Sequence, residues 1–174
     1  IVQILTNSEI YKREIPTFNT KEEELQFFAT KYNYEVSDGK VVAKHQGAHY
    51  FTKGQRKGLA VGGTKEPLFV IDTDVNENVI YTGEGKNHPG LYRNVLFICN
   101  EEIHWVRTDL TLKNGESLSV LARIRYRQKL EKAVIHQRED GLFVVFENEQ
   151  RGIAAGQFIA WYVKDELLGS GVIS

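Results

Sequence analysis

The first regular pattern of apolar positions along the chain begins near residue 20. Thr20 and Glu23 have the Thr-x-x-Glu spacing of a capping box, in which the two side chains bond free backbone N–H groups of the first helical turn. Apolar residues then recur at helical spacing, at Leu25, Phe28, Ala29 and Tyr32. The pattern predicts a helix of roughly three turns that starts after Thr20, stops at Asn33 and packs one face against the rest of the protein.

From residue 36 onward the pattern changes to short β-branched and aromatic runs separated by turn residues. Three pairs of runs flank short polar segments and predict hairpins: residues 68–71 with 79–81, 133–136 with 142–146, and 158–163 with 167–173. Strands at this spacing are typical of a small barrel. We therefore expect a mainly β protein, with a small central β domain that follows an N-terminal helical segment, and a C-terminal β-barrel.

A turn-rich segment at residues 84–90 (EGKNHPG) separates the first hairpin from the later strands. Such segments are typical of domain boundaries. The sequence thus predicts a linker or insertion with one helix at residues 1–36, a central domain at residues 37–87 and the barrel at residues 88–174.

Residues 118–129 (LSVLARIRYRQK) alternate between apolar and cationic positions. On one strand, the cations would share one face at steps of about 6.6 Å: Arg123, Arg125, Arg127 and Lys129. The other, apolar face would carry Leu118, Val120, Ala122, Ile124 and Tyr126. A nucleic-acid backbone would favour such a row through counterion release. The alternative is a solvated edge strand that charge protects from aggregation, or one paired with carboxylates.

A second candidate is the glycine-rich segment at residues 51–63 (FTKGQRKGLAVGG). Its glycines allow backbone amides to approach phosphate oxygens, and Lys53, Arg56 and Lys57 supply positive charge. The order of residues is not that of a Walker loop. As a pattern alone it is also typical of a plain turn between strands.

Composition restricts these hypotheses. The 174 residues carry a formal net charge of −1, so any nucleic-acid site must be a local patch. We expect a soluble, cytoplasmic protein without membrane contact, because no apolar run approaches about 20 residues, no signal peptide is visible, and Cys99 is the single cysteine. The chain starts at Ile1 and contains no methionine, so we expect a segment upstream.

The sequence predicts neither a metal site nor a catalytic set. His45 and His49 are four residues apart, but the intervening glycine and the β context argue against a helix that would pair them as ligands. Cys99 ends an apolar run and is expected to be a small buried hydrophobe. No Gly-x-Ser-x-Gly nucleophile motif is present.

Motifs in fixed order resemble the tRNA-specific 2-thiouridylases, also labelled tRNA (5-methylaminomethyl-2-thiouridylate) methyltransferases. They are GKVVAKHQG at residues 39–47, FTKGQRKGL at 51–59, RYRQ at 125–128, AGQ at 155–157 and LGSGVI at 168–173. The resemblance covers residue 37 to the end, and the GQRKG motif is its most specific part. The family commonly has Pro-Gly-Gln in the fourth motif and Leu-Gly-Gly-Gly in the last, so Ala155 and Ser170 depart from it.

The resemblance implies a chain that is part of a tRNA-uridine 2-sulfurtransferase. In that family an upstream domain uses ATP to adenylate the wobble uridine, and a persulfide, fed by a sulfur-relay donor protein, delivers the sulfur. The phosphate loop and both cysteines of that chemistry belong upstream of the matched region. We therefore expect that this chain binds no ATP, is inactive by itself, and contributes a central domain and a barrel similar to those of translation factors.

The resemblance also implies which residues contact tRNA. Arg125 and Tyr126 match a tRNA-contacting pair, and Gln157 matches a tRNA-contacting glutamine. With the two cationic candidates, the predicted tRNA site comprises Arg123, Arg125, Tyr126, Arg127, Gln157, Lys53, Gln55, Arg56 and Lys57. The competing hypothesis is a non-catalytic β-barrel module that binds a protein through the apolar and acidic surface of residues 22–28.

Overall fold

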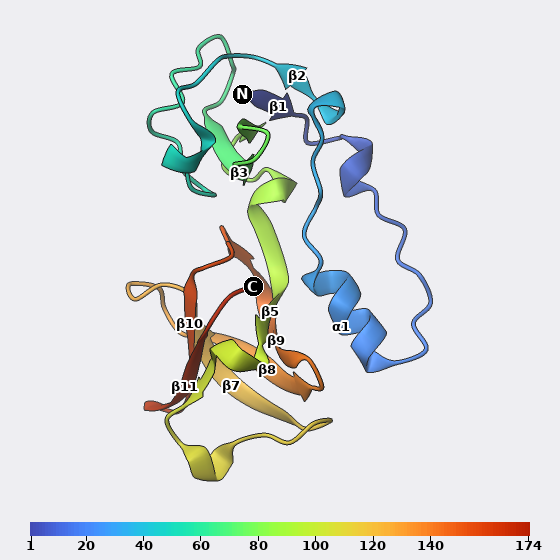
Figure 1. Cartoon of the computed structure of the whole chain (residues 1–174), viewed down its shortest axis with the longest axis vertical. Coiled ribbons are helices and arrows are strands. Elements are labelled where there is room, and N and C mark those ends of the chain that lie inside the picture. Colours follow the sequence, from blue (N-terminus) through green and yellow to red (C-terminus); the bar gives the residue numbers. More distant parts are fainter. The chain divides into compact units, whose positions relative to one another are not determined.

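The computed structural model describes residues 1–174, which divide into two compact units (Figure 1). Unit 1 comprises Ile1–Thr17 and Lys31–Tyr92, and unit 2 comprises Phe18–Thr30 and Arg93–Ser174. Most regular structure is in strands, with one α-helix, so the prediction of a mainly β protein is confirmed. The domain limits predicted at residues 36 and 87 stay a prediction.

Unit 1 contains a four-stranded sheet in the order β2-β1-β4-β3. Its strands are β1 (Val2–Ile4), β2 (Lys40–Val41), β3 (Leu68–Asp74) and β4 (Val79–Glu84), and its 3-10 helices are η1 (Glu9–Tyr11), η2 (Val36–Asp38), η3 (Ala48–Tyr50) and η4 (Pro89–Leu91). The β3–β4 pair is the first predicted hairpin, and it is antiparallel. The Asp74 carboxylate accepts hydrogen bonds from the backbone N–H groups of Asn76 and Glu77, both at 2.9 Å, which fixes the turn.

A buried histidine links the segment after β4 to β1 in unit 1. His88 is 1% exposed; its Nε2 donates to the Ile4 carbonyl at 3.1 Å, while its Nδ1 accepts from the Gly90 N–H at 3.2 Å. The bond to Nδ1 requires the neutral ring, and burial lowers the pKa of His88 by more than the bond to the Ile4 carbonyl raises it. Gly83 makes room for this ring, because a Cβ there would lie 2.3 Å from it.

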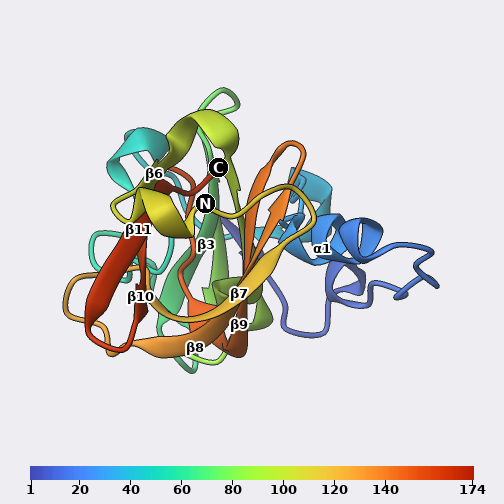
Figure 2. The ribbon, with the colours of Figure 1, turned by 90° about the horizontal axis from the view of Figure 1, so that it is seen from below.

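Unit 2 contains a seven-stranded sheet in the order β5-β9-β8-β7-β10-β11-β6. Its strands are β5 (Tyr92–Cys99), which begins at the last residue of unit 1, β6 (Ile103–Trp105), β7 (Ser117–Arg123), β8 (Glu131–Arg138), β9 (Gly141–Arg151), β10 (Phe158–Val163) and β11 (Glu166–Val172), with η5 (Asn100–Glu102) and η6 (Thr108–Leu110) between them. The two remaining predicted hairpins, β8–β9 and β10–β11, are confirmed. The sheet curls (Figure 2), and Ser174 N–H, just beyond β11, donates to the Phe97 carbonyl of β5 at 3.0 Å.

The interior of this curled sheet is filled around Trp161, which is 0% exposed. Gly169 lies opposite Trp161 on the neighbouring strand, and a Cβ at Gly169 would lie 2.5 Å from the indole ring. A Cβ at Gly171 would lie 2.8 Å from Ile98. Ser170, between them, faces the other side of the strand. In the LGSGVI motif at residues 168–173, positions 169 and 171 therefore need glycine, whereas position 170 tolerates serine.

Helix α1 (Lys21–Ala29) confirms the predicted start and corrects the predicted end. Thr20 Oγ1 accepts from the Glu23 N–H at 3.1 Å, and the Glu23 carboxylate accepts from the Asn19 N–H at 2.8 Å. The helix stops four residues before Asn33 because Thr30 caps it, donating its hydroxyl to the Gln26 carbonyl. Leu25, Phe28 and Ala29 pack on unit 2 as one stripe, whereas Tyr32 lies beyond the helix and packs on Tyr11 in unit 1. All helices of the chain are too short or too polar to traverse a lipid bilayer.

Candidate nucleic-acid interface

The predicted row of cations does not lie along one strand. The alternation is correct up to Ile124, because Val120, Ala122 and Ile124 are all buried in the core. Strand β7 ends at Arg123, however, and residues 124–130 form a loop. The prediction that Tyr126 shares the apolar face is wrong, since its side chain is 86% exposed.

Gln128 is the reason why the strand does not continue. Its Oε1 accepts from the Ile124 N–H at 3.1 Å, and its backbone N–H donates to the Arg125 carbonyl at 3.0 Å. Its amide nitrogen also donates to the amide oxygen of the buried Gln150. These bonds satisfy backbone groups that a longer strand would have paired with a neighbour.

Arg123 positions the loop rather than facing solvent as part of a row. Its guanidinium donates to the Tyr126 carbonyl and to the Tyr162 hydroxyl, both at 3.0 Å. The carbon at its centre also lies 5.2 Å from the ring centroid of Tyr126 and 5.3 Å from that of Tyr162, within range of a cation–π interaction. Arg123 therefore holds Tyr126 through both its backbone and its ring.

Arg125 anchors the same loop to the end of β9. Its two terminal nitrogens donate to the carbonyls of Arg151 and Gly152, each at 3.1 Å. A guanidinium has five N–H donors, so this pairing leaves donors for a ligand. Arg125 thus combines a structural contact with an exposed positive charge.

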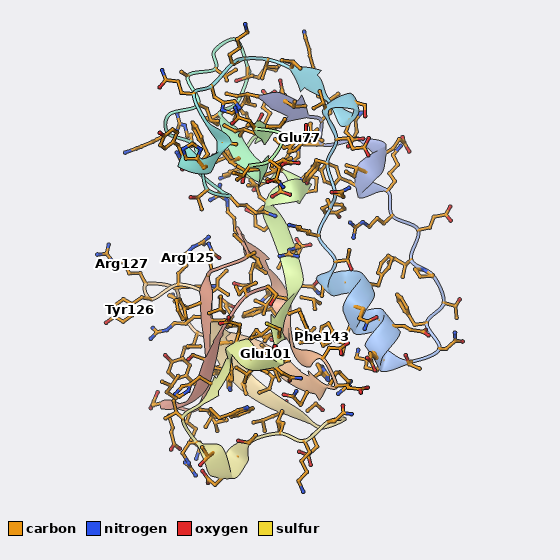
Figure 3. The ribbon with its side chains drawn as sticks, viewed as in Figure 1. Glu77, Glu101, Arg125, Tyr126, Arg127 and Phe143 are labelled. Atoms are coloured by element: carbon orange, nitrogen blue, oxygen red, sulfur yellow. The ribbon has the colours of Figure 1, made fainter.

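Arg127 and Tyr126 lie at the outer end of the loop and point away from the sheet (Figure 3). Arg127 is exposed and makes no hydrogen bond or ion pair within the protein. Lys129, the last cation of the predicted row, is also exposed, beyond the turn. Of the three arginines, Arg127 is the one whose charge the fold itself does not use.

Gln157 comes to the same place from a different part of the chain. Its Oε1 accepts from the Ala154 N–H at 3.3 Å, and its backbone carbonyl accepts from the Ile173 N–H at 2.8 Å. Gly156 precedes it with φ +80°, a left-handed conformation that favours glycine. The side chain accepts through its oxygen, which leaves the amide N–H groups as donors to a ligand.

Arg123, Arg125, Tyr126 and Gln157 line one pocket of about 360 Å³ in unit 2, whereas Arg127 lies outside it. Arg123, Ala160 and Ser170 form a row across β7, β10 and β11. Strands β7 and β10 are antiparallel, so the loop after Arg123 and Gln157 before β10 lie toward the same end of this strand pair. The full lining is Arg123, Ile124, Arg125, Tyr126, Gln157, Phe158, Ile159, Ala160, Tyr162 and Ser170. It holds two arginines, three aromatic rings and no carboxylate, so it favours a planar, anionic ligand.

Six of the ten lining residues were not among the predicted site residues, and they include Phe158, Tyr162 and Ser170. Strand β10 reads FIAWYV, which is apolar throughout, so its letters do not tell which face is buried. The structure buries Ile159 and Trp161 and turns Phe158, Ala160 and Tyr162 to the pocket. The one available signal was the position of Phe158 directly after the AGQ motif.

The glycine-rich loop forms a separate candidate in unit 1. Gly54 N–H donates to the Val70 carbonyl at 2.7 Å, and Val70 N–H donates to the Gln55 carbonyl at 2.9 Å, so the loop is fastened to β3. The Gln55 amide spans the loop, accepting from the Thr52 N–H at 3.2 Å and donating to the Lys57 carbonyl at 2.8 Å. Gln55 thus holds the loop in shape.

The cations of this loop differ in exposure. Arg56 and Lys57 are exposed, and Lys53 is half-buried. Arg56 also lines a pocket of about 340 Å³ with residues 59–68, a stretch that includes Gly62, Gly63 and Lys65. The loop therefore presents positive charge beside glycine-rich backbone, as phosphate-binding loops do.

The remaining candidates have ordinary structural environments. His45 Nε2 donates to the Asn78 carbonyl at 3.0 Å, while the ring of His49 packs on Tyr50 with centroids 4.0 Å apart. Cys99 was predicted to be buried, and this is wrong: it is half-buried at the end of β5, where the apolar run gives way to a polar turn.

The competing hypothesis was a protein-binding surface at residues 22–28, and the apolar part of this surface packs within unit 2. Leu25 of α1 is 2% exposed and packs against Val95 and Phe143. Phe28 and Ala29 pack on the same cluster. The apolar side of residues 22–28 is therefore occupied by the sheet, which leaves its acidic side for any partner.

Comparison with known proteins identifies the lineage of both units. Residues 29–84 match the family model of the tRNA methyl transferase PRC-barrel domain, and residues 97–173 match that of the aminomethyltransferase β-barrel domain. Together the two models account for most of the chain.

Whole-chain similarities agree with these matches. The chain is 60% identical to the tRNA-specific 2-thiouridylase MnmA of Christiangramia forsetii and 58% identical to that of Flavobacterium johnsoniae, in each case over 100% of this chain and 44% of the relative. It is 39% identical to the Stutzerimonas stutzeri protein of the same name over 81% of this chain and 37% of the relative. It thus spans less than half the length of these relatives. By the two domain models and these similarities, the chain belongs to the tRNA-specific 2-thiouridylase family.

Proposed function

We propose that this chain is the tRNA-binding C-terminal portion of an enzyme that 2-thiolates the wobble uridine of tRNA. In the whole enzyme, ATP activates the uridine by adenylation and a persulfide delivers sulfur, which a sulfur-relay donor protein replenishes in the cytoplasm. The chain itself contributes docking and no chemistry. Its relatives named tRNA-specific 2-thiouridylase MnmA are the basis for this assignment of the reaction.

The observation that carries the docking role is that four of the nine predicted residues line one pocket. Arg123, Arg125 and Tyr126 come from the end of β7 and its loop, and Gln157 comes from the start of β10, more than 30 residues later. The four residues share a lining that contains no carboxylate. This supports a single surface that contacts the tRNA backbone.

Such a surface has a clear energetic purpose. A base must leave its stack to enter an active site, which costs a few kcal/mol. Arginine contacts to phosphates release counterions and stabilise the complex elsewhere on the tRNA, offsetting that cost. With a net charge of −1 on the chain, this attraction is confined to local patches.

The glycine-rich loop of unit 1 is the proposed second contact. Arg56 and Lys57 are exposed for phosphates, and Lys53 adds charge nearby in sequence. Gln55 is assigned to the same site through its hold on the loop.

The test compares tRNA binding by the full-length protein and its variants Arg125→Ala and Arg127→Ala. We expect each to weaken binding about fivefold or more, which corresponds to about 1 kcal/mol. Arg127→Ala should also reduce the slope of log affinity against log salt by about 1, because one phosphate contact is lost. Filter binding at four salt concentrations measures both quantities.

Arg138→Ala is the matched control. Arg138 also donates to backbone carbonyls in unit 2, those of Gln137 at 2.7 Å and Glu116 at 3.5 Å, but it lies outside the pocket. It should leave tRNA affinity unchanged. Equal tRNA affinities for folded wild type, Arg125→Ala and Arg127→Ala would exclude the docking role. Thiolation of tRNA by the 174-residue chain alone would contradict the proposal that the chemistry belongs to the rest of the enzyme.

A further inference from the structure

Phe158 is an exposed aromatic residue on the pocket face of β10. Strand β10 alternates, with Ile159 at 1% and Trp161 at 0% exposure facing the core, while Phe158 is 70% exposed at the edge of the pocket. A single exposed apolar residue is ordinary. Here a second ring, Tyr126 at 86% exposure, lines the same pocket from the opposite chain segment.

The surroundings of these two rings define the chemistry of their ligand. The pocket contains Arg123 and Arg125, lacks carboxylates, and offers hydrogen-bonding groups at Gln157 and Ser170. An apolar peptide would gain nothing from the arginines, and a phosphate alone would gain nothing from the rings. An unpaired nucleotide has a planar base for the rings, polar edges for the amide and hydroxyl, and a phosphate for the cations.

We propose that Phe158 and Tyr126 stack on an unpaired nucleotide of the bound RNA, with Phe158 acting as a determinant of affinity. This inference rests on the proposed function, since it assigns a nucleotide to the same pocket. Arg123 supports it as a positioning residue, because it holds the backbone and ring of Tyr126 beside the pocket. Stacking accepts any base, so the contact adds affinity without reading sequence.

Stacking and phosphate contacts respond differently to salt. A phosphate contact releases counterions, and its loss changes the salt slope. Loss of a stacked ring removes an uncharged contact, so affinity falls by the same factor at every salt concentration. Phe158→Ala should therefore lower affinity about tenfold with an unchanged slope, whereas Arg127→Ala changes the slope.

The experiment measures binding of unmodified tRNA to the full-length protein by filter binding at four salt concentrations. The variants are Phe158→Ala, Phe158→Leu and Phe158→Trp. We expect alanine and leucine to weaken binding about tenfold and tryptophan to retain wild-type affinity, because only an aromatic ring stacks. Phe158 is mostly solvent-exposed, so all three variants should have the melting temperature of the wild type, which circular dichroism measures without interference from the added tryptophan.

The outcomes separate the two proposals. Wild-type affinity in Phe158→Ala together with weakened binding in Arg127→Ala overturns the stacking contact and leaves the docking role in place. Wild-type affinity in Phe158→Leu overturns stacking as well, since it shows a merely apolar contact. Wild-type affinity in all of these variants, Arg127→Ala included, removes the docking role itself.

Discussion

Gly169→Ala tests the packing that underlies the candidate site. The added Cβ would lie 2.5 Å from the Trp161 ring and 2.7 Å from the His104 carbonyl of β6. Real Cβ atoms do not approach so closely, and neither neighbour yields easily: the indole is fully buried, and the carbonyl belongs to the paired strand β6. Because the backbone of Gly169 is not left-handed, the penalty is steric.

The magnitude follows from overpacking of a closed core. Insertion of a methyl group into a well-packed interior costs about 1–3 kcal/mol. Unit 2 has fewer than 100 residues, a size for which 1 kcal/mol shifts the melting temperature by about 4–8 °C. A cost of about 2 kcal/mol thus predicts a fall of roughly 8–16 °C. The same displacement would disturb the pocket, which lies on the other face of β10 and β11.

Tryptophan fluorescence is the appropriate assay. The two tryptophans of the chain, Trp105 and Trp161, both lie in unit 2 and contact each other with centroids 5.5 Å apart. Their emission therefore reports the melting of this unit alone. Ser170→Ala is the control, because this side chain lines the pocket and faces away from Trp161. Surface substitutions change the free energy of unfolding by up to about 0.5 kcal/mol. The melting temperature of Ser170→Ala should therefore stay within about 2–4 °C of that of the wild type. A Gly169→Ala protein that melts with the wild type would refute the steric argument.

Two further predictions concern a buried titratable group and a positioning residue. Burial lowers the pKa of His88, so the folded state resists protonation of this ring. The free energy of unfolding should therefore be highest above pH 6.5 and should fall as the pH drops below it. Chemical denaturation at several pH values should show a shallower fall for His88→Gln. A pH dependence unchanged in His88→Gln would exclude the role of this ring. Arg123→Lys keeps the charge but loses the two bonds to Tyr126 and Tyr162. The affinity for tRNA should therefore fall about fivefold, while the slope of log affinity against log salt stays the same. A changed slope would show instead that Arg123 contacts a phosphate of the tRNA.

Local patterns were sufficient where one short stretch of chain contains the whole physical reason. The start of α1 was predicted from Thr20 and Glu23, since capping depends on atoms a few residues apart. The three hairpins were predicted for the same reason, because the turn residues and the alternation of both strands are contiguous. The predicted end of α1 was wrong, because the helix ends where the Thr30 hydroxyl donates to the Gln26 carbonyl. The spacing of apolar residues carries no information about this polar bond.

The candidate site shows the limit of such reasoning. The sequence determined the family and the mainly β class, because these follow from motifs and local periodicity. It also singled out Arg123, Arg125, Tyr126 and Gln157 of the pocket. Only the tertiary structure decided that Gln128 bonds to Gln150, that Arg123 donates to the Tyr162 hydroxyl and that Arg125 donates to the carbonyls of Arg151 and Gly152. It alone also decided that Phe158 faces the pocket. Each depends on a partner brought close by strand pairing, and no local pattern specifies which of two faces of an apolar strand the core will bury.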